Sequence, residues 1–179
     1  MKAQNLTYGS ILGLNIYDVE ISGPIDGGAG TGFNIGGYLD YKLNESFGVR
    51  IDLTYNIITE YDYYIDNIKV IDKINIQSLS LRPLARFDVN QEYNKGFYLV
   101  GGLTLANILS SKADNIANED FYKKFNLSAV LGFGINFGRH FGFEILPEIG
   151  LSDALESTES KSIKTGAYLN LTLNLESLL

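Results

Sequence analysis

The sequence predicts an all-β protein: an eight-stranded, antiparallel, up-and-down transmembrane β-barrel. Apolar residues recur at every second position in eight segments, which is the period of a β-strand. Each segment is about 10–12 residues long, whereas strands average about 5–6 residues in soluble proteins and a tilted membrane-spanning strand needs about 9–11. Short turns also alternate with long polar segments, which is typical of outer-membrane barrels.

The alternation is most regular in the two segments that begin at Phe33 and Phe47 and are separated by a tight turn. The first segment is the least regular, because Ser10 interrupts its apolar face. The predicted strands, all in a single domain of residues 1–179, are residues 6–17, 32–43, 47–58, 74–88, 97–107, 125–137, 141–151 and 162–175. The short turns are residues 44–46, 89–96 and 138–140, and the long polar segments are residues 18–31, 59–73, 108–124 and 152–161.

Two prolines, Pro83 and Pro147, lie inside predicted strands. Proline has no N–H group to donate, and a closed barrel has no free edge that could accommodate it. We therefore expect a bulge or weak pairing at both positions.

The polar face of the strands is predicted to line the lumen. It is rich in glycine, which weakens a water-facing sheet but leaves room in a narrow barrel for large side chains. It carries five basic and five acidic residues, whereas the opposite face carries no charge over the same spans. Because an unpaired buried charge costs roughly several kcal/mol, these ten residues are predicted to form a structural ion network. They are Asp40, Lys42, Arg50, Asp52, Arg82, Arg86, Asp88, Glu144, Glu148 and Lys164.

Aromatic residues gather at both ends of the predicted strands, as in the two girdles of an outer-membrane barrel. At the short-turn end these are Tyr41, Phe47, Phe87, Tyr93, Phe97, Phe137 and Phe141. At the long-loop end they are Tyr17, Tyr61, Tyr63, Tyr64, Phe121 and Tyr122.

The composition excludes several classes of protein. The chain has 179 residues with a net charge of −7, which argues against nucleic-acid binding. It has no cysteine and a single histidine, His140, so disulfides, thiol chemistry and multi-histidine metal sites are excluded. No apolar run is long enough for a transmembrane helix. The polar start shows no signal peptide, which fits a cytoplasmic protein and equally a mature exported protein with an added initiator Met. In the second case Gln4 is the expected mature N-terminus.

No residue pattern predicts catalysis. We place His140 in a short turn without a positioned serine, so it is interpreted as a solvated turn residue. Glu144 and Glu148 are about 13 Å apart along one strand and are interpreted as part of the ion network. The acidic groups in the long segments, Asp62, Asp66 and Asp72 and then Asp114, Glu119 and Asp120, lack the spacing of a calcium loop. We therefore predict no catalytic, cofactor-binding or metal-binding residues, and no cofactor.

Several segments resemble a known family. "FNIGGYLDYKLNESFGVRIDLTYN" at residues 33–56 looks like the second hairpin of the small outer-membrane barrels of Bacteroidota, the PorT-like barrels related in fold to OmpA and OmpX. "SLRPLARFDV" at residues 80–89 is similar to the proline-containing fourth strand of that family. "GFYLVGGLTLANIL" and "KKFNLSAVLGFGINFGRHFGFEILPEIGLSD" resemble its fifth to seventh strands. The resemblance implies a β-barrel in the bacterial outer membrane, and some relatives belong to secretion machinery.

We expect a non-enzymatic barrel with a plugged polar lumen that acts through its surface loops or as a structural or assembly component of the cell envelope. The alternatives are a narrow, porin-like channel for small solutes and a soluble, lipocalin-like carrier. The long segments carry six lysines and thirteen acidic residues, and thus the whole net charge. The expected partners are outer-membrane lipid or lipopolysaccharide and other envelope proteins, with no nucleic acid and a monomeric barrel.

Overall fold

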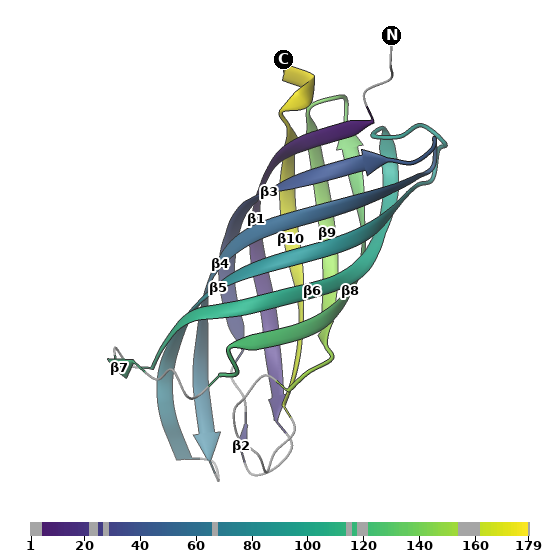
Figure 1. Cartoon of the computed structure of the whole chain (residues 1–179). Helices are drawn as coiled ribbons and strands as arrows, with labels where there is room; N and C mark the ends of the chain where they lie inside the picture. The colour runs from purple at the N-terminus through teal and green to yellow at the C-terminus, as the bar shows by residue number, and fades with distance from the viewer. Residues whose placement is uncertain are drawn as a thin grey trace.

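The computed structural model describes residues 5–21, 25–26, 29–65, 68–113, 116–117, 122–153 and 162–178. Eight long strands form the body of the molecule (Figure 1). They are β1 (Leu6–Ile21), β3 (Gly30–Lys42), β4 (Phe47–Ile65), β5 (Ile68–Asp88), β6 (Gly96–Ala113), β8 (Phe125–Phe137), β9 (Phe141–Gly150) and β10 (Ser162–Asn174). The two-residue strands β2 (Ile25–Asp26) and β7 (Ile116–Ala117) pair with β4 and β6, and a 3₁₀ helix, Glu176–Leu178, follows β10.

The eight long strands form a closed barrel. Each pairs antiparallel with its neighbours in the chain, and β1 pairs with β10, which closes the sheet. The predicted fold class is therefore confirmed. Both chain ends and the short turns lie at one end, and β2 and β7 lie at the other (Figure 1). In the described part of the chain, no helix is long and apolar enough to cross a membrane.

The pairing register tilts the strands strongly. If one starts at Thr7 and steps from each residue to its partner on the next strand, the path around the barrel returns to β1 at Tyr17. Tyr17 is ten residues further along the strand than Thr7. The path runs through Asp40, Arg50, Leu84, Gly102, Val130, Glu148 and Gly166. A stagger of this size requires a strand tilt of about 35–45°, and an eight-stranded barrel of this kind is just wide enough for side chains to fill it.

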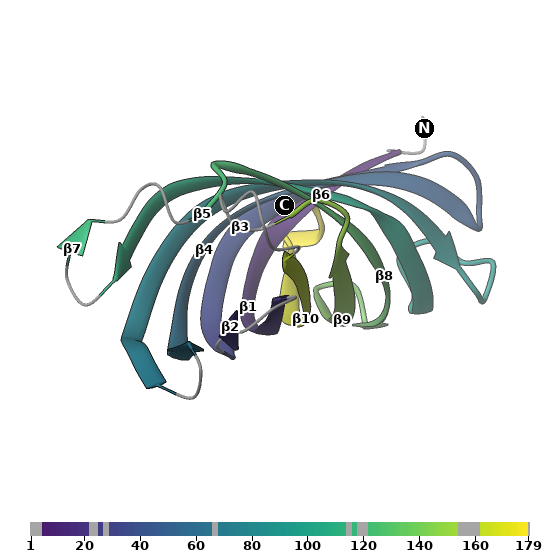
Figure 2. The same ribbon diagram turned by 90° about the horizontal axis from the view of Figure 1, so that it is seen from below.

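Apolar side chains cover the outside of the barrel. The outward residues include Leu12 on β1, Ile35 on β3, Leu53 on β4 and Leu131 on β8, which is 72% exposed. On the same strands the residues between them point inward and are polar, charged or glycine, as in the pattern of β3. Viewed from the long-loop end, the strands curve around a common axis (Figure 2). Because a soluble carrier has an apolar interior and a polar exterior, the lipocalin-like alternative is excluded.

Both prolines interrupt the sheet on one side only. The β5–β6 ladder has no paired residues between Leu81 and Leu84, and the β8–β9 ladder has none between Ile145 and Glu148. Pairing on the other side is intact, with Pro83 opposite Ile51. The register is the same before and after each gap, so the prolines weaken pairing without a bulge. The irregularities in register lie elsewhere, at Tyr63/Tyr64 and Gln77/Ser78.

Four strands extend well beyond their predicted ends. Residues 59–73 were expected to form a loop, but β4 and β5 continue through them and pair as far as Ile65 and Ile68. β6 likewise continues to Ala113, and β1 continues to Ile21. The prediction ended a strand where its outward face stopped being apolar. Lipid imposes that requirement only inside the membrane, and a strand that projects into water needs backbone pairing but no apolar face.

The aromatic girdles are only partly as expected. Tyr41, Phe47, Phe97, Phe137 and Phe141 are exposed at the short-turn end, and Tyr61 is exposed at the other. In contrast, the side chains of Tyr17 and Tyr122 are buried in the lumen, and Tyr93 turns into its mouth. Phe121 and the side chains of Tyr63 and Tyr64 lie outside the described residues.

Candidate functional site

The candidate site is the charged interior of the barrel, built mainly on β3, β4, β5 and β9. Alternation along β4 directs Arg50, Asp52, Thr54 and Asn56 inward one after another. The strand is rigid and paired on both sides, so the positions of these side chains are fixed by the sheet. Three arginines, Arg86, Arg50 and Arg82, lie near the inward-facing carboxylates between the short-turn end and the middle of the barrel.

Arg50 bridges the lumen from β4 to β9. Its Nε donates to Asp52 Oδ1 at 2.6 Å, and its two terminal nitrogens contact the Glu144 carboxylate, with Nη2 to Oε2 at 3.3 Å. The Tyr98 hydroxyl donates to Glu144 Oε1 at 2.6 Å, and the Tyr38 ring lies 4.5 Å from the guanidinium. All five residues are buried. Each charge in this Arg50 cluster therefore has an opposite charge in contact with it, as a buried ion pair requires.

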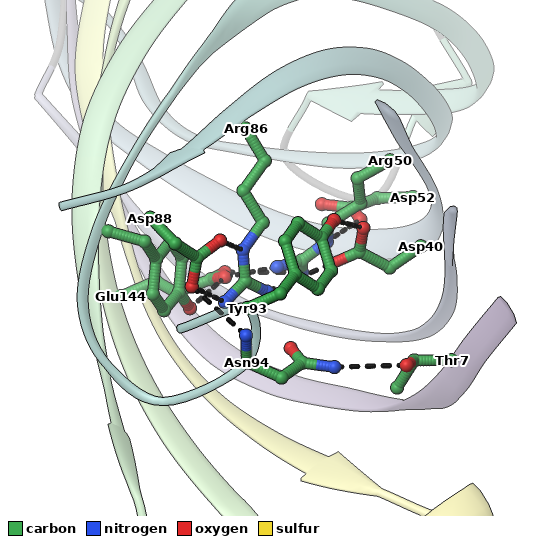
Figure 3. A network of polar contacts seen from close by, with 10 residues as sticks. Thr7, Asp40, Arg50, Asp52, Arg86, Asp88, Tyr93, Asn94 and Glu144 are labelled. Carbon is green, nitrogen blue, oxygen red and sulfur yellow. Dashed lines mark hydrogen bonds and ion pairs between the residues drawn. The ribbon is translucent and has the colours of Figure 1, made fainter. Parts of the chain in front are cut away.

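Arg86 forms a second cluster nearer the short turns (Figure 3). Its Nη1 donates to Asp40 Oδ2 at 2.9 Å, while Nε and Nη2 form a bidentate pair with Asp88 at 2.8 and 2.9 Å. The guanidinium also lies 3.9 Å from the centre of the Tyr98 ring and 4.9 Å from that of Tyr93. Such planar, bidentate contacts are among the strongest that arginine makes.

The turn between β5 and β6, residues 89–95, folds into the mouth of the barrel. The Tyr93 hydroxyl donates to Asp40, the Asn94 backbone N–H donates to Asp88 Oδ1 at 3.1 Å, and the Asn94 side chain donates to Thr7 at 2.9 Å (Figure 3). Gly48 makes room for it, because a Cβ atom there would lie 1.8 Å from the Tyr93 hydroxyl oxygen. Burial, followed by the charge of Asp40, raises the pKa of Tyr93, so its phenol stays protonated and keeps donating. We call Tyr93 and Asn94 the turn plug.

The remaining charges are less closely paired. Arg82 lies 4.0 Å from Asp52 Oδ2 and is stacked 4.0 Å from the Tyr168 ring centre. Glu148 accepts a hydrogen bond from Thr104 at 2.7 Å. The Lys164 ammonium lies 4.2 Å from the centre of the Tyr17 ring, nearer the long-loop end.

The structure places nine of the ten predicted network residues in the lumen. The exception is Lys42, which lies beside the short turn and pairs with Glu45 at 2.7 Å. Glu60, which was assigned to an acidic loop, is instead fully buried on β4 and accepts a hydrogen bond from Tyr122. The described lumen thus contains four cations and six carboxylates rather than five of each. The alternation that continues through Asn56 and Ile58 could have identified Glu60.

A small vestibule opens from the lumen towards the long loops. It is lined by Tyr17, Ile58, Glu60, Tyr122 and Lys164, among others. The space inside it for the centres of water-sized molecules is about 30 Å³. This is enough for two or three water molecules, at about 10–15 Å³ each.

His140 has a serine partner that the sequence did not reveal. Its Nδ1 lies 2.7 Å from the Ser177 hydroxyl oxygen, in the 3₁₀ helix after β10. The same hydroxyl lies 2.9 Å from the Asn174 carbonyl, to which it can also donate, so it is held between the histidine and the backbone at the end of β10. The pair secures the end of the chain, because the backbone N–H of Asn174 also donates to the His140 carbonyl at 2.7 Å.

The structure brings together no metal ligands where it describes side chains: no three His, Asp or Glu residues are grouped suitably there. The acidic groups predicted as solvated loops, Asp62, Asp66, Asp72, Asp114, Glu119 and Asp120, lie outside the residues whose side chains are described.

Gly48→Ala is predicted to expel the turn plug. The new methyl group takes the space of the Tyr93 hydroxyl, which is the far end of a flexible side chain, so the ring moves and the barrel stays folded. The turn then becomes mobile, and trypsin should cut after Lys95 several-fold faster than in the wild type. Tyr93→Ala should have the same effect, and Gly101→Ala, on the outer face, should have none. Equal cleavage in all four proteins would show that Tyr93 does not hold the turn.

An antiparallel barrel with an apolar exterior and a charged interior filled by side chains defines the class of integral outer-membrane barrels. The chain belongs to the outer membrane protein beta-barrel domain family, whose model matches residues 2–156. It is a protein of the bacterial outer membrane, as the sequence predicted. A comparison with curated protein sequences finds no match.

Solved structures share the fold at low sequence identity. Ail, the attachment invasion locus protein of Yersinia pestis, has a TM-score of 0.59 and 14% identity over 94% of this chain and 98% of its own. Ail in complex with the heparin analogue sucrose octasulfate has a TM-score of 0.54 and 14% identity over 96% and 100%. Neisserial surface protein A (NspA) has a TM-score of 0.58 and 13% identity over 94% and 97%.

Proposed function

We propose that the protein is a non-enzymatic outer-membrane barrel whose lumen is closed by its own side chains. It would act through its long-loop end or as a structural or assembly component of the cell envelope. The observation that carries this proposal is the pair of arginine clusters. Arg50 contacts Glu144 on β9 from β4, on opposite sides of the barrel, so this cluster crosses the lumen, whereas Arg86 on β5 contacts Asp40 on β3 and fills the lumen beside β4. The turn plug covers the clusters from the short-turn side.

The energetics of the clusters support a permanent closure. An ion that crossed the barrel would have to separate several buried, charge-assisted contacts at once, and breaking one such pair costs about 3–5 kcal/mol. The charged residues hold one another, and the serine–histidine contact in the described part of the chain lies at the short-turn end, where it ties the 3₁₀ helix to the turn before β9. These features favour a plugged, non-enzymatic barrel over the porin-like alternative.

Planar-bilayer recording of the purified barrel tests the closure. We expect the wild type to give no stable conductance steps. Tyr93→Ala combined with Arg86→Ala and Arg50→Ala should give them, because this variant removes the turn plug and the arginines of both clusters. Reproducible steps from the wild type, with ion flow that depends on voltage and salt, would instead establish the narrow-channel alternative.

The partners are proposed from charge and location. The long segments carry most of the acidic residues, although Glu60 does not contribute to that surface because it is buried. We propose that this end of a monomeric barrel meets lipopolysaccharide through divalent cations, or other envelope proteins, and does not bind nucleic acid. Membership of the PorT-like branch of Bacteroidota remains a proposal that the motifs at residues 33–56 and 80–89 support. If magnesium and calcium leave the association of the barrel with lipopolysaccharide unchanged, the bridging proposal fails.

A further inference from the structure

A groove lies at the short-turn end of the barrel, where three segments meet. They are the turn between β5 and β6, the turn between β8 and β9 (residues 138–140), and the 3₁₀ helix after β10. We call it the mouth groove, and its lining includes Asn94, Lys95, Arg139, Asn174, Glu176 and Ser177. The space inside it for the centres of water-sized molecules is about 270 Å³. Because an apolar cavity of about 150 Å³ can hold benzene, the mouth groove has space for a small organic molecule.

The three segments around the mouth groove are held in place by the protein itself. In the β5–β6 turn, the Asn94 side chain donates to Thr7 at 2.9 Å (Figure 3). In the β8–β9 turn, the His140 carbonyl accepts from the Asn174 backbone N–H at 2.7 Å. In the 3₁₀ helix, the Ser177 backbone N–H donates to Asn174 Oδ1 at 3.2 Å. The walls are therefore arranged before a ligand binds, which lowers the entropy lost on binding.

Two opposite charges line the mouth groove without pairing with each other. Arg139 is exposed in the β8–β9 turn, and Glu176 is partly buried in the 3₁₀ helix. Among the described residues neither forms an ion pair, whereas Lys95 in the same groove is paired with Glu92 at 3.1 Å. The planar guanidinium fork of arginine fits a carboxylate, and a glutamate accepts hydrogen bonds from an ammonium group. A ligand that satisfies both residues must carry one group of each sign.

The inner end of the mouth groove contains an unused hydrogen-bond donor. A smaller pocket that Asn136 lines shares Asn94, Arg139 and Asn174 with the mouth groove, so the two spaces adjoin. Asn136 Nδ2 is buried and has no hydrogen-bond partner in the described part of the chain. The space in this pocket for the centres of water-sized molecules is about 10 Å³, which is enough for one oxygen atom. A carboxylate oxygen placed there would accept from Asn136, and Arg139 lines the same pocket.

The position of the mouth groove favours a peptide over a lipid headgroup, although both can carry an ammonium group and an anion. Asn136 and Asn174 occupy inward-facing positions in the alternation of β8 and β10. Asn94 belongs to the turn plug, which covers the lumen. The groove therefore opens at the mouth of the barrel and not on the outer face that contacts lipid. Outer-membrane barrels turn their short turns towards the periplasm, so a ligand reaches the groove from that side.

We propose that the mouth groove is a binding site for a short peptide with a free amino group and a free carboxylate. The carboxylate lies between Arg139 and Asn136, and the amino group lies beside Glu176. The inference goes beyond the proposed function, because it assigns a ligand to the periplasmic end of the barrel. Whether the lumen conducts ions has no bearing on it.

Triglycine is the probe that tests the proposal, titrated into the barrel in non-ionic detergent micelles and followed by solution NMR of the backbone amides. The amides of Arg139 and Ser177 should shift in a saturable manner, and that of Asn44, in the β3–β4 turn, should not. Triglycine amide, which lacks the carboxylate, and N-acetyltriglycine, which lacks the amino group, should each bind several-fold more weakly. Absence of binding, or equal binding of all three peptides, would overturn the proposal.

Two variants assign each end of the peptide to its partner. Arg139→Gln should remove the difference between triglycine and triglycine amide, and Glu176→Gln should remove the difference between triglycine and N-acetyltriglycine. The matched controls, Lys42→Gln and Glu45→Gln, remove the same charges from a surface pair outside the groove and should leave all three affinities unchanged. Heat-dependent gel mobility checks that each variant is a closed barrel. If the controls weaken binding as much as the groove variants, or if glycerophosphoethanolamine binds more tightly than triglycine, the mouth groove is not a peptide site.

Discussion

Arg50→Ala is expected to destabilise the barrel by about 3–5 kcal/mol, the usual cost of removing one partner of a buried ion pair. Arg50 touches two carboxylates, those of Asp52 and Glu144, and all three side chains are almost completely excluded from solvent. Without the guanidinium, Arg82 at 4.0 Å is the nearest cation to Asp52, and Glu144 keeps only its hydrogen bond from Tyr98. Urea unfolding in detergent micelles, followed by the heat-dependent gel mobility of the closed barrel, measures the loss.

Lys42→Ala is the matched control, because it removes a basic residue from a neighbouring position with a different environment. Its pair with Glu45 is a surface contact between residues three apart, and such pairs contribute about 0–1 kcal/mol. A second variant, Arg50→Met with Glu144→Gln, removes one charge of each sign and should recover part of the stability lost in Arg50→Ala. If Arg50→Ala and Lys42→Ala lose the same small amount, the Arg50 cluster does not stabilise the barrel.

The barrel itself could be predicted because lipid enforces a simple rule. Every outward residue in the membrane must be apolar, so inward residues such as Arg50, Asp52 and Glu144 stand out by their alternation with leucine, isoleucine and phenylalanine. The rule ceases to apply at the membrane surface. Lys42 occupies an inward-facing position in the alternation of β3, but it is the last residue of that strand and water reaches it. Glu60 lies beyond the last regular apolar position of β4.

The finer structure of the site follows from geometry that a strand pattern does not contain. The turn plug lies in a turn, where the direction of a side chain depends on local backbone torsions such as the positive φ of Asn94. The inward and outward alternation of a strand therefore does not predict where Tyr93 points. The contact of Asn34 with Asn170 joins residues that are 136 positions apart, and it depends on the registers in which β1 pairs with β3 and β10, because both residues lie opposite Gly13. His140 and Ser177 likewise meet only because β10 ends beside the short turn that precedes β9.

Gly102→Ala is the second substitution with a large expected effect. Gly102 is on β6 beside the gap in pairing that Pro83 creates, and a Cβ atom there would lie 2.1 Å from the Pro83 carbonyl oxygen and 3.0 Å from Leu84 Cα. Both atoms belong to the backbone of β5, so no side chain can move aside and the strands must separate. We expect a loss of about 3 kcal/mol, at the upper end of the usual range for overpacking.

The adjacent residue provides the control for Gly102→Ala. At Gly101 a Cβ atom would lie 3.3 Å from the end of the Leu131 side chain and 3.7 Å from the Val130 carbonyl oxygen, which is an ordinary contact, so Gly101→Ala should change stability by less than about 0.5 kcal/mol. The two variants add the same methyl group to neighbouring residues of one strand, and they differ only in the face of the sheet that receives it. The same urea titration compares them. Equal stabilities would mean that β5 and β6 do not approach as closely as the register implies, whereas a loss confined to Gly102→Ala would show that glycine permits the strand contact beside the proline.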